Sequence, residues 1–481
     1  MNSTDMLALL PLLLIAATAI LVMLAIAVRR SHLVSAVLTV LGFCAAFATL
    51  FVAAQFAPRE MTPLIIIDSS ALFYMGLILA ASIAVVFLCY GYFKQEESHR
   101  PEELYLLLAI AVLGSGVLVC ASHFASFFLG LELLSVALYG LISYERTTKA
   151  SVEVGLKYLV LAAASASFLL FGMAILYFEF GTMDFSGIMA ATAAQGVDFA
   201  TIAVAVSLIV VGIGFKLGLV PFHMWTPDVY EGAPAPVAAF VSTVSKGAMF
   251  ALLIRFFDQS GVRNDSSILL VFSIIAIASM IAGNLLALLQ NNVKRILAYS
   301  SIAHLGYLVV AFEAGGPFGR SAVAFYLVAY FVTMLGAFGV VTVLSRPGDD
   351  LGHLNGYRGL FWRRPVLASV FTVMLLSLAS IPLTAGFIGE FYLVAAGASG
   401  SLWALVIILV VSSAIGLFYY LRIVLALYSH MPESAGEAVA PSRASSHSLS
   451  WTLGVLTVAV ILIGCYPNPV MRLIQTMVAG S

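Results

Sequence analysis

Long apolar segments separated by short polar ones recur along the whole chain of 481 residues. A membrane-crossing helix needs roughly 20 apolar residues at about 1.5 Å per residue, and fourteen segments meet this length. They are 6–28, 33–54, 70–93, 104–121, 124–144, 155–178, 200–222, 235–257, 267–289, 296–312, 321–344, 365–396, 402–428 and 449–470. Because lipid cannot satisfy an open backbone, we expect an all-α polytopic membrane protein of about 14 transmembrane helices.

The composition supports a single membrane domain over 1–481. Hydrophobic residues make up 62% of the chain and charged residues only 9%, a balance that water-soluble domains do not have. The hydrophilic stretches 345–364 and 429–448 are too short to form further domains. The first segment lacks the basic start and short apolar core of a signal peptide, so we expect it to remain as a helix.

Lys and Arg are unevenly divided between the two ends of the predicted helices. Fifteen of the 22 basic residues follow odd-numbered segments, including Lys294 and Arg295 after the ninth, whereas five lie at the other end and two within helices. Cytoplasmic connections carry such an excess, so we predict that both termini lie outside the cytoplasm. Basic connections can also form a patch that binds nucleic acid or anionic lipid, but the insertion rule already explains them. We therefore expect the ordinary lipid contacts of a membrane protein and no nucleic-acid partner.

Four charged residues lie inside otherwise apolar segments: Glu132, Lys216, Lys246 and Glu390. A charge at bilayer depth costs at least about 2.5–3.5 kcal/mol on insertion scales, and such residues commonly mark an ion path. Lysine releases its proton on burial more readily than arginine, which a static pair would more often use. We therefore predict proton or cation translocation, and buried ion pairs that only hold helices together are the alternative.

Two of the charges lie near a repeated Leu-x-x-apolar-Pro pattern. Leu217-Gly-Leu-Val-Pro221 precedes Leu378-Ala-Ser-Ile-Pro382 by five segments, so the two helices cross the membrane in opposite directions. Proline removes a backbone hydrogen bond, and paired interruptions are typical of inverted repeats. We predict discontinuous helices 7 and 12 within two inverted five-helix repeats, 104–257 (helices 4–8) and 267–428 (helices 9–13). Lys216 would lie toward the cytoplasm and Glu390 toward the outside, as parts of one relay.

The sequence has no pattern for a cofactor or a metal. Its four cysteines are too far apart for a zinc or iron–sulfur site and are expected to be small buried residues: Cys44, Cys89, Cys120 and Cys465. It has no glycine-rich nucleotide loop. No two of the histidines nearest the membrane segments are spaced for one helix face. We therefore expect no bound cofactor or metal, and energy must come from an ion gradient or a partner.

Two stretches resemble signatures of the antiporter-like membrane subunits of respiratory complex I. The first is Gly214-Phe-Lys-Leu-Gly-Leu-Val-Pro-Phe-His-Met-Trp-Thr-Pro-Asp-Val-Tyr-Glu-Gly-Ala-Pro-Ala-Pro-Val237, and the second is Asn292-Val-Lys-Arg-Ile-Leu-Ala-Tyr-Ser-Ser-Ile-Ala-His-Leu-Gly-Tyr307. With 357–396 and the fourteen segments, the resemblance covers essentially the whole chain and points to the subunit N branch of bacterial NADH-quinone oxidoreductases. It matches the family's polar axis to Glu132, Lys216 and Lys246, with His223 and His304 in or beside that axis.

The resemblance implies a subunit of a proton-translocating NADH:quinone oxidoreductase in the bacterial inner membrane. NADH, FMN, iron–sulfur clusters and quinone would be bound by partner subunits, and quinone reduction there would drive the Glu/Lys relay. The expected partners are neighbouring antiporter-like and small membrane subunits. Two alternatives are a subunit of a multi-subunit cation/proton antiporter and an inert spacer in the membrane arm.

One position departs from the family pattern. The subunit N branch usually has lysine after Gly-Phe-Ile-Gly in helix 12, whereas this chain has Gly386-Phe-Ile-Gly-Glu390. The neighbouring subunit M usually has glutamate at this position, although the flanking residues here resemble subunit N more closely. The outward end of the predicted relay therefore keeps a titratable group but has the opposite charge.

Overall fold

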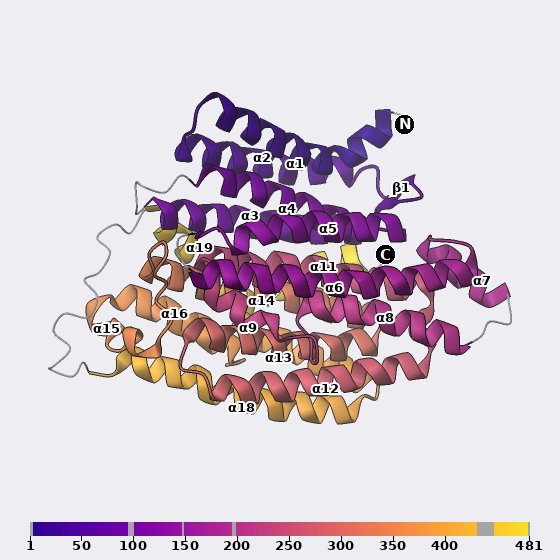
Figure 1. The fold of residues 1–481 in the computed structure, drawn as a ribbon. Coiled ribbons are helices and arrows are strands. Elements are labelled where there is room, and N and C mark those ends of the chain that lie inside the picture. Colours follow the sequence, from indigo (N-terminus) through magenta and orange to yellow (C-terminus); the bar gives the residue numbers. More distant parts are fainter. Residues whose placement is uncertain (1–2, 95–100, 147–148, 195–198, 431–446, 480–481) are drawn as a thin grey trace.

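The computed structural model describes residues 3–94, 101–146, 149–194, 199–430 and 447–479, so most of the predicted connection 429–448 lies outside it. The long helices lie side by side along a roughly common direction, with α1 and α2 at one edge and α12 and α18 at the other (Figure 1).

The first half of the chain forms long helices with a small hairpin and a short helix between them. The elements are α1 (Ser3–Val28), α2 (His32–Ala53), β1 (Arg59–Thr62), β2 (Ile65–Ile67), α3 (Ser69–Phe93), α4 (Glu102–Cys120), α5 (Phe124–Ile142), α6 (Lys149–Phe180), α7 (Phe185–Ala194) and α8 (Phe199–Leu217). The antiparallel β1–β2 hairpin and α7 were not predicted, because neither contains a long apolar run.

The second half continues with α9 (Trp225–Gly232), α10 (Ala235–Phe240), the π-helix η1 (Val241–Ser245), α11 (Lys246–Ser260), η2 (Val262–Asn264), α12 (Ser266–Leu288), α13 (Val293–Ala314), α14 (Gly316–Leu344), η3 (Leu354–Tyr357), α15 (Leu360–Arg363), α16 (Pro365–Leu378), α17 (Ala385–Ser399), α18 (Trp403–Tyr428), α19 (His447–Cys465), α20 (Asn468–Ile474) and η4 (Gln475–Ala479). Within the described ranges, thirteen helices are long and apolar enough to cross a membrane. The chain is an all-α polytopic membrane protein, as predicted.

Both predicted interruptions are present. The predicted seventh membrane helix corresponds to α8. It ends at Leu217, so the predicted range 200–222 was too long, and Gly218 after it has a φ of +75°. The predicted twelfth membrane helix, given as one segment over 365–396, is divided into the shorter helices α16 and α17. Glycine adopts a positive φ without the steric cost that a side chain brings, which explains the first break.

Corresponding helix pairs of the two predicted repeats pack backbone to backbone. Between α4 and α5, a Cβ on Gly114 would lie 2.6 Å from the backbone nitrogen of Leu134. Between α12 and α13, a Cβ on Gly283 would lie 2.7 Å from the backbone nitrogen of Ala303. Small residues permit this close approach in membranes. The likeness agrees with an inverted repeat, which stays a prediction.

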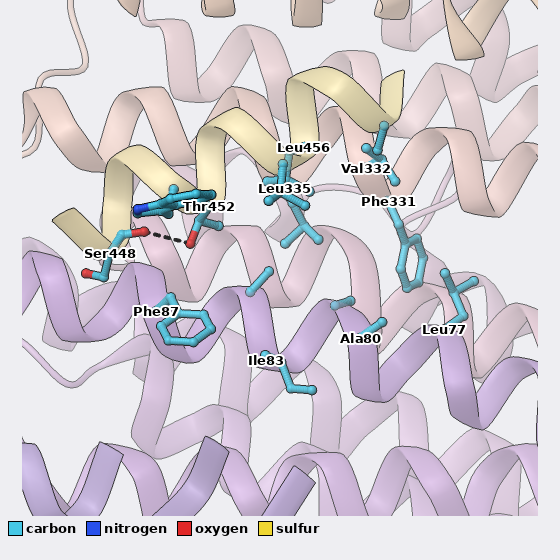
Figure 2. A pocket seen from close by; sticks show the side chains of 15 residues that line it. Leu77, Ala80, Ile83, Phe87, Phe331, Val332, Leu335, Ser448, Thr452 and Leu456 are labelled. Carbon is cyan, nitrogen blue, oxygen red and sulfur yellow. Dashed lines mark hydrogen bonds between the residues drawn. The ribbon is translucent and has the colours of Figure 1, made fainter. Parts of the chain in front are cut away.

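The flank of the bundle has an apolar pocket of about 580 Å³ between α3, α14 and α19 (Figure 2). Aliphatic and aromatic side chains line it, and Thr452 bonds back to its own helix at Ser448 beside it. None of the four intramembrane charges lines this pocket. The expectation that all four cysteines are buried was wrong, because Cys44 and Cys465 are exposed on the outer surface of their helices.

Candidate functional site

Lys216 lies in the last turn of α8 and is only 2% exposed. Its Nζ donates hydrogen bonds to Ser135 Oγ at 2.9 Å and to the hydroxyl of Tyr158 at 3.1 Å. Glu132, one helical turn before Ser135 on α5, interacts electrostatically with this ammonium. The predicted Glu132–Lys216 neighbourhood therefore exists, and hydroxyl groups supply the direct contacts of the lysine.

The break after Lys216 has partners for its freed backbone groups. The indole Nε1 of Trp225 donates to the carbonyl of Phe215 at 2.8 Å, and the backbone N–H of Val220 donates to Ser279 Oγ at 2.9 Å. Unpaired backbone groups are costly at membrane depth, so these bonds stabilise the interruption. The interruption thus has defined side-chain partners from α9 and α12.

Lys246 is the first residue of α11, directly after the π-helix η1. It is 1% exposed, its Nζ donates to Ser301 Oγ at 2.8 Å, and it lies 5.4 Å from the ring centre of Tyr230. A Cβ on Gly218 would be 3.4 Å from this Nζ, so the lysine lies against the helix break. Single π-turns occur often at functional sites, and this one positions the lysine.

An aromatic residue links the surroundings of the two lysines. The ring of Trp225 lies 5.0 Å from the ring of Tyr158, which bonds Lys216, and 6.0 Å from the Nζ of Lys246. Both ammonium groups therefore lie close to aromatic faces, which attract cations.

Ser301 on α13 connects Lys246 to a cluster of tyrosines and a histidine. The Ser301 hydroxyl accepts from Tyr330 at 2.7 Å as well as from Lys246. One turn later, His304 Nδ1 bonds the hydroxyl of Tyr326, and its Nε2 lies 2.9 Å from the hydroxyl of Tyr420. Hydroxyl and imidazole groups both donate and accept hydrogen bonds, so this cluster has the groups that proton transfer requires.

Glu390 on α17 is 9% exposed and forms the far end of the row. Its carboxylate accepts a hydrogen bond from the hydroxyl of Ser380. A Cβ on the preceding Gly389 would lie 2.9 Å from Cδ2 of Tyr326, which places Glu390 beside the histidine cluster. The row therefore extends from Glu132 to Glu390, from α5 through α11 to α13 and α17; α5, α11 and α13 can be followed in Figure 1.

The histidines have different roles. His304 is part of the row, whereas His223 lies in the break between α8 and α9, where its buried Nδ1 has no hydrogen-bond partner among the described residues. His123 accepts a hydrogen bond from Ala125 N and caps α5. Within the described ranges, no group of three His, Cys, Asp or Glu side chains is placed to hold a metal ion.

Sequence reasoning found the charges and noted Ser135, but it missed the other hydroxyl groups of the row. Tyr158, Ser301, Tyr326 and Tyr330 belong to helices whose apolar pattern hid them, although tyrosine inside a membrane segment is a usable signal. Lys294 was wrongly placed in a basic connection. It lies in the first turn of α13, is 1% exposed, and its Nζ is 2.5 Å from Asp350 Oδ2.

Known proteins resemble this chain over nearly its full length. The family described as "NADH:quinone oxidoreductase/Mrp antiporter, TM" matches residues 121–416. A protein from Ectopseudomonas mendocina (strain ymp) named NADH-quinone oxidoreductase subunit N is 49% identical over 480 residues, 98% of this chain and 97% of the relative.

Solved structures share the fold. A chain of respiratory complex I from Thermus thermophilus has a TM-score of 0.81 at 30% identity, over 96% of this chain and 98% of that one. A chain of the Mrp complex from a Dietzia species has a TM-score of 0.86 at 18% identity, over 99% and 97%, and this likeness concerns the fold alone. The chain belongs to the family of NADH:quinone oxidoreductase and Mrp antiporter transmembrane subunits.

Proposed function

We propose that the chain is the proton-translocating subunit N of a bacterial NADH-quinone oxidoreductase, in the inner membrane with both termini outside. One observation carries the proposal: a row of titratable and hydroxyl groups, from the partly exposed Glu132 to the buried Glu390, passes both helix breaks of a chain that belongs to this family. NADH, FMN, iron–sulfur clusters and quinone are bound by partner subunits, among them neighbouring antiporter-like and small membrane subunits. This chain contributes the proton path and no redox centre.

The row supports a stepwise mechanism. When a change in a neighbouring subunit disturbs Glu132, Lys216 loses its electrostatic partner and yields a proton toward Lys246. A change of one pKa unit is about 1.4 kcal/mol and moving one charge against 100 mV takes about 2.3 kcal/mol, so a change of a few units in the pKa of the lysine is large enough to drive the step. From Lys246 the proton passes Ser301, the tyrosines and His304 and reaches Glu390, which releases it to the outside.

Replacing Lys216 tests the relay against a static ion pair. Lys216→Arg keeps a positive charge and hydrogen-bond donors, but guanidinium does not release its proton in proteins. A relay predicts that Lys216→Arg and Lys216→Met both translocate about tenfold fewer protons or less per NADH oxidised, measured with the assembled complex in liposomes. A static pair predicts normal translocation for Lys216→Arg. The exposed Lys157→Gln on α6 is the control and should translocate normally.

The fold likeness to an Mrp complex gives one competing function, a subunit of a cation/proton antiporter. Sodium transport by the purified chain in liposomes would favour it. The inert spacer makes a different prediction, namely that Lys246→Met leaves translocation intact. Because Lys246 is buried against the break at Gly218, we expect that variant to lose translocation instead.

A further inference from the structure

A buried ion pair between Lys294 and Asp350 lies at the end of the bundle that has the basic connections. Lys294 Nζ contacts Asp350 Oδ2 at 2.5 Å and also donates to the carbonyl of Ala233 at 2.7 Å. The other carboxylate oxygen, Oδ1, lies 2.8 Å from the hydroxyl of Tyr92. The Lys294 side chain is 1% exposed and that of Asp350 is 12% exposed, so solvent reaches the pair only from the aspartate side.

Further charged groups surround this pair from every neighbouring element. Glu145 at the end of α5, 4% exposed, and Asp349 both interact electrostatically with Tyr92. On the other side, the neighbouring Arg295 forms salt bridges with Asp228 at 2.9 Å and with Glu231 at 2.8 Å. The cluster is therefore rich in carboxylates, and Lys294 is its buried cation.

The interface between α9 and α13 joins this cluster to Lys246. Ser301 follows Lys294 by seven residues, two turns along the same face of α13 and about 10 Å away. On the facing helix, Tyr230 precedes Ala233 by three residues, and its hydroxyl lies 3.2 Å from Ser301 Oγ. The ring of Tyr230 also lies 5.4 Å from the Nζ of Lys246. Polar groups thus occur at both ends of one helix interface, and a proton crossing the interval between them requires bridging water.

We propose that Asp350 and Lys294 form the mouth of an intake path that delivers protons to Lys246 between α9 and α13. In one cycle the Asp350 carboxylate accepts a proton from water, which weakens its bond to Lys294. The Lys294 ammonium then releases a proton through the Tyr230 and Ser301 hydroxyls to the amine of Lys246. Asp350 returns its proton to Lys294, so that one proton has moved from solution to Lys246.

The alternative is a pair that only fastens the 345–353 connection to α13. Three features favour proton transfer. A buried ion pair by itself contributes little stability, so fastening alone is a weak reason for it. The cation is lysine and not arginine, and it lies on the same face of α13 as Ser301, to which Lys246 donates. This inference rests on the proposed function, because it supplies the relay's central lysine.

Two matched tyrosine variants test the path. Tyr230→Phe keeps the ring against Lys246 and removes only the hydroxyl near Ser301. Tyr357→Phe also removes a buried hydroxyl, which donates to Leu351 O at 2.7 Å beside Asp350 but lies off the path. We expect Tyr230→Phe to lower protons translocated per NADH at least about threefold and Tyr357→Phe to leave the ratio unchanged. Equal ratios in the two variants would overturn the path.

Asp350 gives a second, independent measurement. Asp350→Asn should lower proton translocation by roughly tenfold or more, Asp350→Glu should retain at least about half, and added formic acid should partly restore Asp350→Asn. If Asp350 only fastens the connection, formic acid restores nothing. Absence of any restoration would therefore overturn the inference. If Lys216→Arg translocates normally, the proposed function itself fails. If Lys216→Arg fails while Asp350→Asn and Tyr230→Phe translocate normally, only the intake path is wrong.

Discussion

Lys216 lies in the last turn of α8 before the first break, and Glu390 lies in α17 after the second break, so the two breaks have buried groups of opposite charge beside them. Lys216 donates to the hydroxyls of Ser135 and Tyr158, whereas Glu390 accepts from the hydroxyl of Ser380. A hydroxyl group can donate or accept, so the same kind of neighbour stabilises either sign. Each break provides a buried polar site, and the charges around that site decide whether it stabilises a cation or an anion.

The backbones of the two breaks also differ. The first has Gly218 at φ +75°, and a Cβ there would lie 2.5 Å from Thr226 Oγ1. The second has Ser380 at φ 52° and Leu383 at φ 71°, both with side chains. A non-glycine residue in the left-handed region costs roughly 1–2 kcal/mol. Both breaks are tightly packed, since a Cβ on Gly386 at the second would overlap a backbone oxygen of α16. They differ in that the first has glycine at the positive φ, whereas the second has residues with side chains there and so contains strain.

Reversing the charge at the first break should have the largest effect. Lys216→Glu places a carboxylate near Glu132, and like charges in a buried site cannot both ionise. We expect proton translocation per NADH to fall by about tenfold or more in liposomes. The double variant Glu132→Gln/Lys216→Glu removes the repulsion but not the lost lysine, so recovery of translocation in it would show that the sign of the charge is unimportant here.

Gly218→Ala should have the next largest effect. The new methyl meets Thr226 Oγ1 and approaches the Nζ of Lys246, and the positive φ adds roughly 1–2 kcal/mol of strain. We expect a several-fold loss of translocation, about threefold to fivefold, and a lower temperature of thermal inactivation. Gly454→Ala on α19, where nothing lies within 4 Å of the added Cβ, is the matched control. Identical behaviour of the two variants would contradict a tight first break.

Glu390→Lys should have a small effect, in contrast to Lys216→Glu. The Ser380 hydroxyl can turn from donor to acceptor, and lysine keeps a group that can take and release a proton. We expect translocation within about threefold of the original, while Glu390→Leu, which has no titratable group, loses about tenfold. A Glu390→Lys variant as inactive as Glu390→Leu would mean that the second break requires an anion.

Leu383→Gly should have the smallest effect and the opposite sign on stability. Glycine relieves the positive φ, and the leucine side chain is 72% exposed, so little packing is lost. We expect a gain of up to about 1 kcal/mol, seen as a slightly higher temperature of thermal inactivation, with unchanged translocation. A lower temperature would indicate that the Leu383 side chain is held by a contact outside this chain.

Much of the fold could be predicted from the sequence because hydrophobic length is a local property. The spans, the interruptions near Pro221 and Pro382 and the four intramembrane charges follow from stretches of about 20 residues. The exact helix ends did not follow: α8 stops at Leu217 because Gly218 turns the chain, and the π-turn before Lys246 has no sequence signature. The hairpin and α7 lack long apolar runs and were missed.

The sequence by itself determined the membrane class, the two broken helices and the residues Glu132, Lys216, Lys246 and Glu390. Only the tertiary structure decided what those residues contact. Lys216 and Ser135 are 81 residues apart, and Lys246 and Ser301 are 55 residues apart. The same holds for Lys294, which reads as a basic connection residue and becomes a buried partner of Asp350. Hydrogen-bond partners depend on which helix faces meet, and no local pattern of hydrophobic and polar residues specifies that meeting.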